Sequence, residues 1–405
     1  MPELKVAHSE ESKTTLSPKG RFFDYTLLII VLLLIVYGLI MVYSTSAFSG
    51  MQEGDPAKYF RKQLISTMIG FGFMLLATFI DYRRWYKLKV PIYILSVLSI
   101  FLVIPFGADI NGANRWIRIG GFSLQPAEIV KLGLIVSLAG FITYSGKKIS
   151  KFRNNLFFCG MAGIAALFIL VITNNLSTAI IVLGIAYLMI VVGNNKPKWY
   201  IVLMVTLVAI ATVIVVLIFK NPDGANGFRF KRILAWRDPE AYASDVGFQT
   251  LQSLYALGSG GFFGKGLGQS LQKLGFIPEA QNDMVFSVIC EELGLFGGIC
   301  LIVLFILLIW RLMIIANNAP DLFGSMIVVG VMAHISIQVV LNIAVVTNAI
   351  PNTGVTLPFI SYGGSSVVFL MTEIGLVFSV SRLVRVPVTV KSRPERPVKT
   401  SRQNA

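Results

Sequence analysis

Charged residues are scarce in this chain, and cysteine and histidine are almost missing. Only 14% of the 405 residues are Asp, Glu, Lys or Arg, compared with about 25% in a soluble globular domain. The three cysteines lie within apolar runs and indicate neither a disulfide framework nor a cysteine metal site. Of the two histidines, His334 stands alone in an apolar run and is expected to be a core histidine, and His8 lies in the N-terminal tail, so no zinc site is suggested. With 55% hydrophobic residues and a mean hydropathy of +0.74, the composition excludes a soluble or fibrous protein.

Long apolar runs are what the chain has instead. Each run of about 17 to 25 residues can cross the hydrocarbon core of a bilayer as one helix. We therefore predict an all-α polytopic membrane protein with about ten transmembrane helices. Two of the runs are separated only by Asn174 and Asn175 and must form a helical hairpin. The predicted spans are 23–45, 63–80, 88–106, 125–144, 156–173, 176–193, 200–219, 284–310, 324–349 and 358–380.

The distribution of Lys and Arg predicts the orientation. With the N-terminus inside, the cytoplasmic segments hold 22 of the 35 Lys and Arg residues and the short outer loops hold five. Both termini are therefore predicted to be cytoplasmic. Juxtamembrane basic residues attracted to anionic headgroups also explain the net charge of +15 without a nucleic acid partner. The predicted parts are an N-terminal tail (1–22), seven spans (23–219), a large extracytoplasmic loop (220–283), three spans (284–382) and a basic, disordered cytoplasmic tail (383–405).

Chemistry is expected in or beside the large loop, because such long connections are uncommon unless they are functional. Asp283 stands where this loop becomes a membrane helix. One interpretation is an N-cap, since an aspartate there accepts N–H bonds from the first turn. The other is a functional carboxylate that opens a polar face into the bilayer. Glu291 and Glu292, within the same apolar helix, are either functional or paired with another span.

A second group of polar residues surrounds the start of the span at 125–144. Glu128 and Lys131 have the i, i+3 spacing of a helical ion pair. Trp116 is expected at the membrane interface, and its neighbours Arg115 and Arg118 could bind an anionic phosphate. Arg229 and Arg232 have the spacing of one face of a short amphipathic helix at the same interface.

Two further segments have unusual sequences. The glycine-rich run Gly258–Gly268 superficially resembles a nucleotide-binding loop, but Ser259 and Gly266 break that pattern, so close backbone packing or a hinge is the better interpretation. The segment Pro351–Ser366 holds too many helix breakers for a plain helix, and its non-helical backbone is expected to line a cavity.

Together these residues resemble the SEDS proteins (shape, elongation, division and sporulation), and specifically their FtsW/SpoVE branch. The resemblance covers nearly all spans. It departs from the family at two places, where Gln281-Asn282-Asp283-Met284 replaces His-Thr-Asp-Phe and Asn174–Thr178 replaces Pro-Asp-Leu-Gly-Thr. The motifs that carry it are Phe23–Tyr25 with Val42–Ser44, Gly112–Lys131, Arg229 and Arg232 before Ile233–Pro239, Gln252–Gly261, Pro278–Gly294 and Pro351–Ser366.

The resemblance implies a SEDS fold and a peptidoglycan glycosyltransferase. Such an enzyme polymerises lipid II on the outer face of the bacterial cytoplasmic membrane, here for septal wall synthesis in cell division. The implied partners are a class B penicillin-binding transpeptidase and other divisome membrane proteins. The alternatives are a lipid II flippase or transporter, built on the buried charges, and a non-catalytic scaffold for the transpeptidase.

The resemblance also implies roles for individual residues. It identifies Asp283 with the essential aspartate, which would take the proton of the acceptor hydroxyl as a general base. It places Trp116 on the family's tryptophan. No cofactor is required by this interpretation, although a divalent cation (Mg²⁺ or Mn²⁺) is an alternative source of positive charge for the leaving pyrophosphate. The predicted substrate-binding residues are Trp116, Arg115, Arg118, Arg229, Arg232, Lys131, Glu128 and Ser365.

Overall fold

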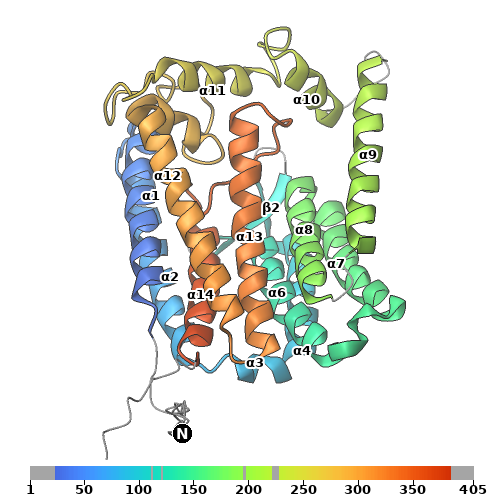
Figure 1. The fold of residues 1–405 in the computed structure, drawn as a ribbon. Helices are drawn as coiled ribbons and strands as arrows, with labels where there is room; N and C mark the ends of the chain where they lie inside the picture. Colours follow the sequence, from blue (N-terminus) through green and yellow to red (C-terminus); the bar gives the residue numbers. More distant parts are fainter. Residues whose placement is uncertain (1–22, 111–112, 120–121, 195–197, 221–227, 385–405) are drawn as a thin grey trace, which may run out of the picture.

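The structure is a computed structural model that describes residues 23–110, 113–119, 122–194, 198–220 and 228–384. Its described part is a bundle of long helices with one small sheet (Figure 1). The elements are α1 (Tyr25–Gln52), α2 (Lys58–Phe79), α3 (Arg83–Lys87), α4 (Lys89–Phe101), α5 (Val103–Phe106), β1 (Gly107–Ile110), β2 (Ala113–Ile119), β3 (Phe122–Leu124), α6 (Pro126–Ser145), α7 (Phe152–Thr173), α8 (Leu176–Gly193), α9 (Lys198–Lys220), α10 (Phe228–Arg237), α11 (Phe248–Ser259), α12 (Val285–Asn317), α13 (Leu322–Val346) and α14 (Gly364–Ser381), with a 3₁₀ turn at Gly146–Ser150.

Ten helices in the described part of the chain are long and apolar enough to cross a membrane. They coincide with the ten predicted spans, so the all-α polytopic class is confirmed. The hairpin at Asn174 is also present, because this residue has left-handed backbone angles and separates α7 from α8. The bounds differ most at the ends of α1 and α12, which extend to Gln52 and Asn317 instead of 45 and 310. The helix of the last span begins at Gly364 and not at position 358. The breaker-rich residues before it are non-helical, as their sequence indicates.

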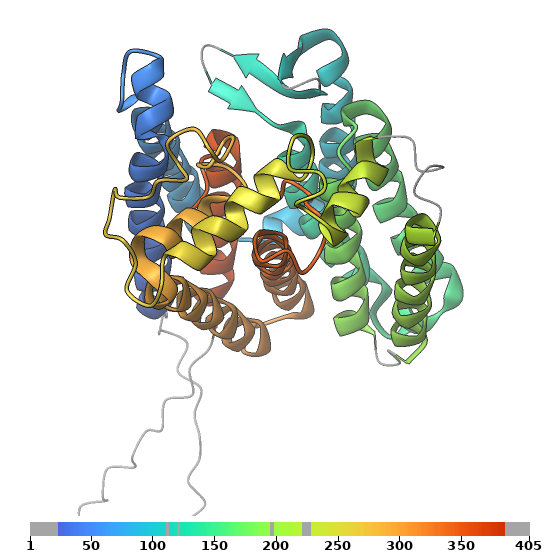
Figure 2. The same ribbon diagram turned by 90° about the horizontal axis from the view of Figure 1, so that it is seen from above.

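The bundle has two distinct ends. The first and last described residues lie at the same end, and α10 and α11 lie across the opposite end (Figure 1). The segment between α9 and α12 therefore forms a partial cover over the bundle, which is visible from above in Figure 2. The tails 1–22 and 385–405 lie outside the described residues.

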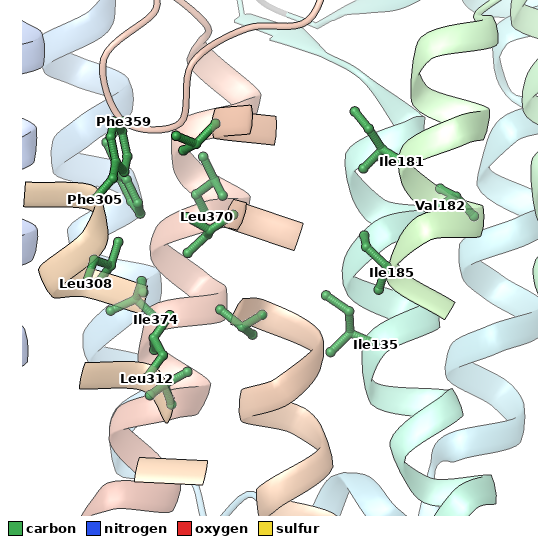
Figure 3. Packing of buried hydrophobic residues seen from close by; sticks show 14 of the residues in the cluster. Ile135, Ile181, Val182, Ile185, Phe305, Leu308, Leu312, Phe359, Leu370 and Ile374 are labelled. Atoms are coloured by element: carbon green, nitrogen blue, oxygen red, sulfur yellow. The ribbon is translucent and has the colours of Figure 1, made fainter. Parts of the chain in front are cut away.

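The core is packed around α13, which contacts α6, α8, α12 and α14. Apolar side chains fill both sides of this helix, and small residues allow close approach where helices cross. At Gly330, for example, an added Cβ would lie 2.6 Å from the Ile135 side chain. Figure 3 shows Phe305, Leu308 and Leu312 of α12 near Leu370 and Ile374 of α14, with Ile135, Ile181, Val182 and Ile185 on the other side.

A small antiparallel sheet is the main element that the apolar runs did not predict. Strand β2 pairs with both β1 and β3 in the outer connection between α5 and α6. Alternating residues in β2 and the two-residue sequences Asn111-Gly112 and Gly120-Gly121 between the strands are the hairpin signals that predict it. These two pairs of residues themselves lie outside the described part.

Candidate active site

Asp283 lies directly before α12, at the end of the bundle that α10 and α11 cover. The N-cap of α12 is Met284, and no side chain caps the helix. The Asp283 carboxylate is therefore not used to cap α12, which rules out the N-cap interpretation of Asp283. The Asp283 side chain is partly buried and contacts Gln249 of α11, one of the helices that cover the bundle.

Two amide side chains hold Asp283 in place. Gln249 on α11 donates a hydrogen bond from Nε2 to the Asp283 carboxylate at 3.2 Å. Asn342, fully buried on α13, donates from Nδ2 to the Asp283 backbone carbonyl and to the Val355 carbonyl, both at 2.7 Å. The catalytic candidate is thus fixed between α11, α13 and the breaker-rich segment before α14.

The surroundings of Asp283 change its acidity. Burial raises the pKa of its carboxyl from 3.8 to about 6, and the negative charge of Glu279 acts in the same direction. The backbone N–H of Asp283 itself, the charge of Arg232 and the hydrogen bond from Gln249 lower this pKa, but burial outweighs them. A carboxylate with a pKa of about 6 is ionised at neutral pH and still basic enough to accept a proton.

Arg232 on α10 is a basic residue whose charge acts on this carboxylate. Its guanidinium donates from Nη1 to the Asn352 carbonyl at 3.2 Å. The Asn352 side chain in turn donates to Gln249 Oε1 at 2.9 Å. Burial lowers the pKa of Arg232, the charge of Arg115 lowers it further, and Asp283 raises it. The charges of Arg115 and Asp283 therefore both act on Arg232. A series of hydrogen bonds through Asn352 and Gln249 also connects the Arg232 guanidinium to the Asp283 carboxylate.

The two predicted arginines on β2 have different positions. Arg115 donates to the Thr173 carbonyl at 3.2 Å and to the Asn174 carbonyl at 3.1 Å, which places it between the sheet and the α7–α8 turn. Arg118 is exposed. The register of β1 and β2 shifts at Arg115, between the pairs Ala108–Trp116 and Asp109–Asn114. Arg115 acts electrostatically on Arg232. That Arg115 and Arg118 bind an anionic phosphate stays a prediction.

Trp116 and Arg118, two residues apart in β2, lie on the same face of the strand. Trp116 is partly buried, and its backbone is in register with Ala108 of β1. Arg229 lies in α10, but its side chain is outside the part that the structure describes. Its place in the site remains a prediction.

The remaining substrate-binding candidates lie where α6 and α14 begin. Lys131 and Glu128 form a buried ion pair at 2.8 Å, as their spacing indicates. The hydroxyl of Ser365, also buried, accepts a hydrogen bond from the Gln125 backbone at 3.2 Å. No hydrogen bond between described residues links these three side chains to Asp283.

The other buried carboxylates of the spans all have basic partners. Glu291 binds Lys265 Nζ at 2.7 Å, and Glu292 binds Lys273 Nζ at 2.6 Å. Glu373 on α14 lies 2.8 Å from His334 on α13. His334 is thus a core histidine with a local partner, and the glutamates of α12 are structural pairs rather than members of the site at Asp283.

Three residues of this site were missed by the sequence analysis. Gln249, Asn342 and Asn352 are far from Asp283 in the sequence, and only the fold brings them together. Two signals were available. Asn342 is a polar amide inside an otherwise apolar span, where polar groups are costly and usually functional, and Asn352 lies in the breaker-rich segment Pro351–Ser366 that was expected to line a cavity.

Few of the side chains around Asp283 are of the kinds that bind metal ions. Within the described residues, no group of three or more His, Cys, Asp or Glu side chains could hold an ion. Asp283 has one carboxylate neighbour that affects it, Glu279. These two carboxylates are the residues that would hold a magnesium ion, which commonly takes one or two carboxylates and completes its shell with water and substrate phosphates.

Comparisons with known proteins agree with this architecture. A family model for FtsW, RodA and SpoVE, described as "Cell cycle protein", matches residues 25–386. Stage V sporulation protein E of Bacillus subtilis (strain 168) is 40% identical over 368 residues, covering 89% of this chain and 98% of that protein. A probable peptidoglycan glycosyltransferase FtsW of Geobacter metallireducens is 37% identical over 363 residues, covering 89% and 94%.

Solved structures share the fold. A chain from work on polymerization and crosslinking by a peptidoglycan synthase complex has a TM-score of 0.74 and 28% identity, with 89% of this chain and 98% of that chain covered. The rod shape determining protein RodA of Thermus thermophilus has a TM-score of 0.65 and 27% identity, with 89% and 97% covered. The match thus spans the whole bundle in both sequence and structure, and the chain belongs to the FtsW/RodA/SpoVE family of cell cycle proteins.

Proposed function

We propose that this protein is a peptidoglycan glycosyltransferase that polymerises lipid II into glycan strands. The observation that carries the proposal is Asp283, a partly buried carboxyl with a pKa of about 6 that caps no helix and lies beside Arg232. Such a group is suited to general base catalysis at neutral pH. The names of relatives, such as the probable peptidoglycan glycosyltransferase FtsW, support the same reaction.

In the proposed reaction Asp283 takes the proton of the acceptor 4-hydroxyl. The hydroxyl oxygen forms a bond to the anomeric carbon of the donor, the bond from that carbon to the pyrophosphate breaks, and lipid pyrophosphate leaves. Because an α-linked donor gives a β-linked polymer, the displacement inverts the anomeric centre, and one base is sufficient. Gln249 orients the carboxylate through its hydrogen bond at 3.2 Å.

The leaving pyrophosphate needs positive charge. Arg232 and Arg115, which share one electrostatic environment with Asp283, are the proposed source. Arg229, Arg118, Trp116 and Ser365 remain proposed substrate contacts on the basis of the family motifs, as does the pair Glu128–Lys131. Asp283 and Glu279 would hold a divalent cation if one takes part, and such an ion would supply further positive charge for the leaving pyrophosphate.

The proposed setting is the division septum. The lipid II polymerase would work in the cytoplasmic membrane with both termini inside, and the Lys and Arg distribution supports this orientation. A class B penicillin-binding transpeptidase is the proposed partner, together with other divisome membrane proteins. The similar chain from a peptidoglycan synthase complex supports such an assembly.

The alternative of a flippase depends on buried charges along a substrate path. In the described bundle, however, Glu128, Glu291 and Glu292 each form an ion pair with a lysine within 2.8 Å, and Glu373 lies 2.8 Å from His334. Paired charges of this kind support stable packing more than an open polar path. A non-catalytic scaffold would have no use for the raised pKa at Asp283.

The experiment that separates these functions uses purified protein in vesicles with fluorescent lipid II. A polymerase converts the lipid into glycan strands that migrate slowly in a gel and are cut by a muramidase. A flippase instead moves intact lipid II between leaflets without forming polymer. Polymer formation with and without the transpeptidase supports the proposal, and transport without polymer would overturn it.

A further inference from the structure

The glycine-rich run Gly258–Gly268, which lacks the pattern of a nucleotide-binding loop, packs its backbone against α12. Helix α12 is interrupted at Gly294, which has a φ of 69°. The backbone groups around this break pair with the segment that follows α11. The four hydrogen bonds are Lys265 N to Glu291 O and Gly266 N to Glu292 O, both 2.9 Å, and Leu295 N to Gly261 O and Phe296 N to Phe262 O, both 3.0 Å.

Glycine is required where the two backbones meet. Gly264 has a φ of 80°, and an added Cβ would lie 2.2 Å from the Glu292 carbonyl oxygen. At Gly260 an added Cβ would lie 1.9 Å from the Cys290 carbonyl oxygen. The expected close backbone packing is therefore present, and the partner is α12 rather than a nucleotide.

Two buried ion pairs attach the same segment to the bundle. The Glu291 carboxylate, fully buried, accepts from Lys265 Nζ and from the Leu271 backbone N–H at 3.1 Å. The Glu292 carboxylate, also fully buried, accepts from Lys273 Nζ and from the Ser44 hydroxyl of α1. Residues 258–276, which we call the outer segment, are thus held rigidly against α12 and α1.

The outer segment nevertheless presents large apolar side chains outward. Phe263 is 78% exposed, and its ring packs edge-on against Phe262 at 4.8 Å. Soluble surfaces rarely gather so many large apolar groups within a short stretch, and a patch of this kind marks an interaction surface. The exposed residues are Phe262, Phe263, Leu267, Leu271, Leu274 and Phe276.

The positions of two tyrosines on α1 indicate how deep this surface lies in the membrane. Tyr25 and Tyr43 are both exposed on α1 and are separated by about 27 Å along the helix at 1.5 Å per residue. This distance is close to the thickness of the hydrocarbon core, about 30 Å, and tyrosines are enriched at both of its boundaries. With the N-terminus inside, Tyr43 marks the outer boundary of the hydrocarbon.

The outer segment lies at that boundary. Ser44, next to Tyr43 in α1, accepts a hydrogen bond from Lys273 Nζ at 2.9 Å. One turn farther out, the Phe48 ring lies 3.3 Å from the position of a Cβ on Gly275. These contacts place the second half of the segment at the depth of the lipid headgroups.

The first half of the segment lies deeper. On the inner side of Ser44, the Tyr37 hydroxyl lies 3.5 Å from the Gly297 carbonyl oxygen. The Phe262 carbonyl accepts a hydrogen bond from the backbone N–H of Phe296, the residue before Gly297. Phe262 therefore lies at a depth between those of Tyr37 and Ser44. Seen from above, this part of the chain runs around the edge of the bundle beside α1 (Figure 2). Phe262 and Phe263 are therefore at a depth where acyl chains surround the protein.

We propose that the outer segment is inserted into the outer leaflet of the membrane, with Phe262, Phe263 and Leu267 in contact with lipid acyl chains. The extracytoplasmic connection is then only partly in water, and its glycine-rich part belongs to the lipid-embedded surface. The backbone groups of this non-helical stretch are satisfied by the break in α12, which is the condition for irregular backbone at membrane depth. This proposal does not depend on the enzymatic activity.

The test uses the full chain in phosphatidylcholine vesicles, with Cys159, Cys290 and Cys300 replaced by alanine and one cysteine carrying an environment-sensitive fluorophore. The probe is placed at Phe263, with Glu240 in the exposed α10–α11 connection as the water control. A third probe at Val303, farther along α12 and 46% exposed, is the deep membrane control. Quenching is measured with iodide in water and with lipids carrying a nitroxide near the top or the middle of the acyl chain.

We expect the probe at 263 to be quenched by the shallow nitroxide and protected from iodide. The probe at 240 should be quenched by iodide and not by the shallow nitroxide. The probe at 303 should be quenched most by the deep nitroxide. Iodide quenching at 263 equal to that at 240 would overturn the proposal. Protection of 263 from all quenchers would also overturn it, because a second protein copy rather than lipid would then cover the surface. Gel filtration of each labelled variant shows whether it is folded.

Discussion

Replacing Asp283 by asparagine separates catalysis from stability in this protein. In the fold, burial raises the pKa of this carboxyl from 3.8 to about 6. At about 1.4 kcal/mol per pKa unit, holding the carboxylate ionised in the site costs about 3 kcal/mol at neutral pH. Asparagine keeps the size and the hydrogen-bonding capacity without this cost. We therefore expect Asp283→Asn to abolish polymerisation and to raise thermal stability.

The pH dependence of this gain has a definite sign. Because the folded pKa lies above the unfolded one, the native state binds the proton more tightly, and wild-type stability falls as the pH rises from about 4 to about 6. The advantage of Asp283→Asn should thus be largest above pH about 6 and vanish below about 4. Melting curves of both proteins at pH 4, 5, 6 and 8 measure it. A variant that is less stable than wild type at pH 8 would refute the assignment of a costly, buried base.

Further expectations concern the groups around this carboxylate. Gln249→Leu removes a donor that lowers the pKa of the base, so the acid limb of the rate profile should move up by about one pH unit; an unchanged limb contradicts the orienting role. Arg232→Lys should not restore activity lost in Arg232→Gln if the guanidinium binds pyrophosphate through two bonds, whereas Arg237→Lys, at an exposed position, should be harmless. Lys273→Met leaves a buried carboxylate unpaired and should cost about 3 to 5 kcal/mol of stability. Lys58→Met at an exposed pair should cost less than about 1 kcal/mol in the same melting assay.

The positions of the spans could be predicted from the sequence because a bilayer demands long apolar runs. The hairpin at Asn174 and the non-helical segment before Gly364 followed from the same reasoning. The strands could not be predicted from apolar runs, because β2 is a short strand, Ala113–Ile119, in which polar and apolar residues are mixed.

The site itself was only partly predictable. Asp283 was found through the motif that surrounds it, but its neighbours Gln249 and Asn342 come from helices whose packing no local pattern fixes. Glu291 and Glu292 looked equally suited to function, and only their contacts with Lys265 and Lys273 identify them as structural. Buried ion pairs between a loop and a helix have no sequence spacing from which to predict them.

The most direct test of the central claim is the pH dependence of lipid II polymerisation by the wild-type protein at subsaturating substrate. If Asp283 is the base, activity requires its ionised form, and the rate should fall tenfold per pH unit below an apparent pKa of about 6. A rate that stays constant down to pH 4.5 would contradict the account, because the base would then have an unperturbed carboxyl pKa or would not be a carboxyl in this site.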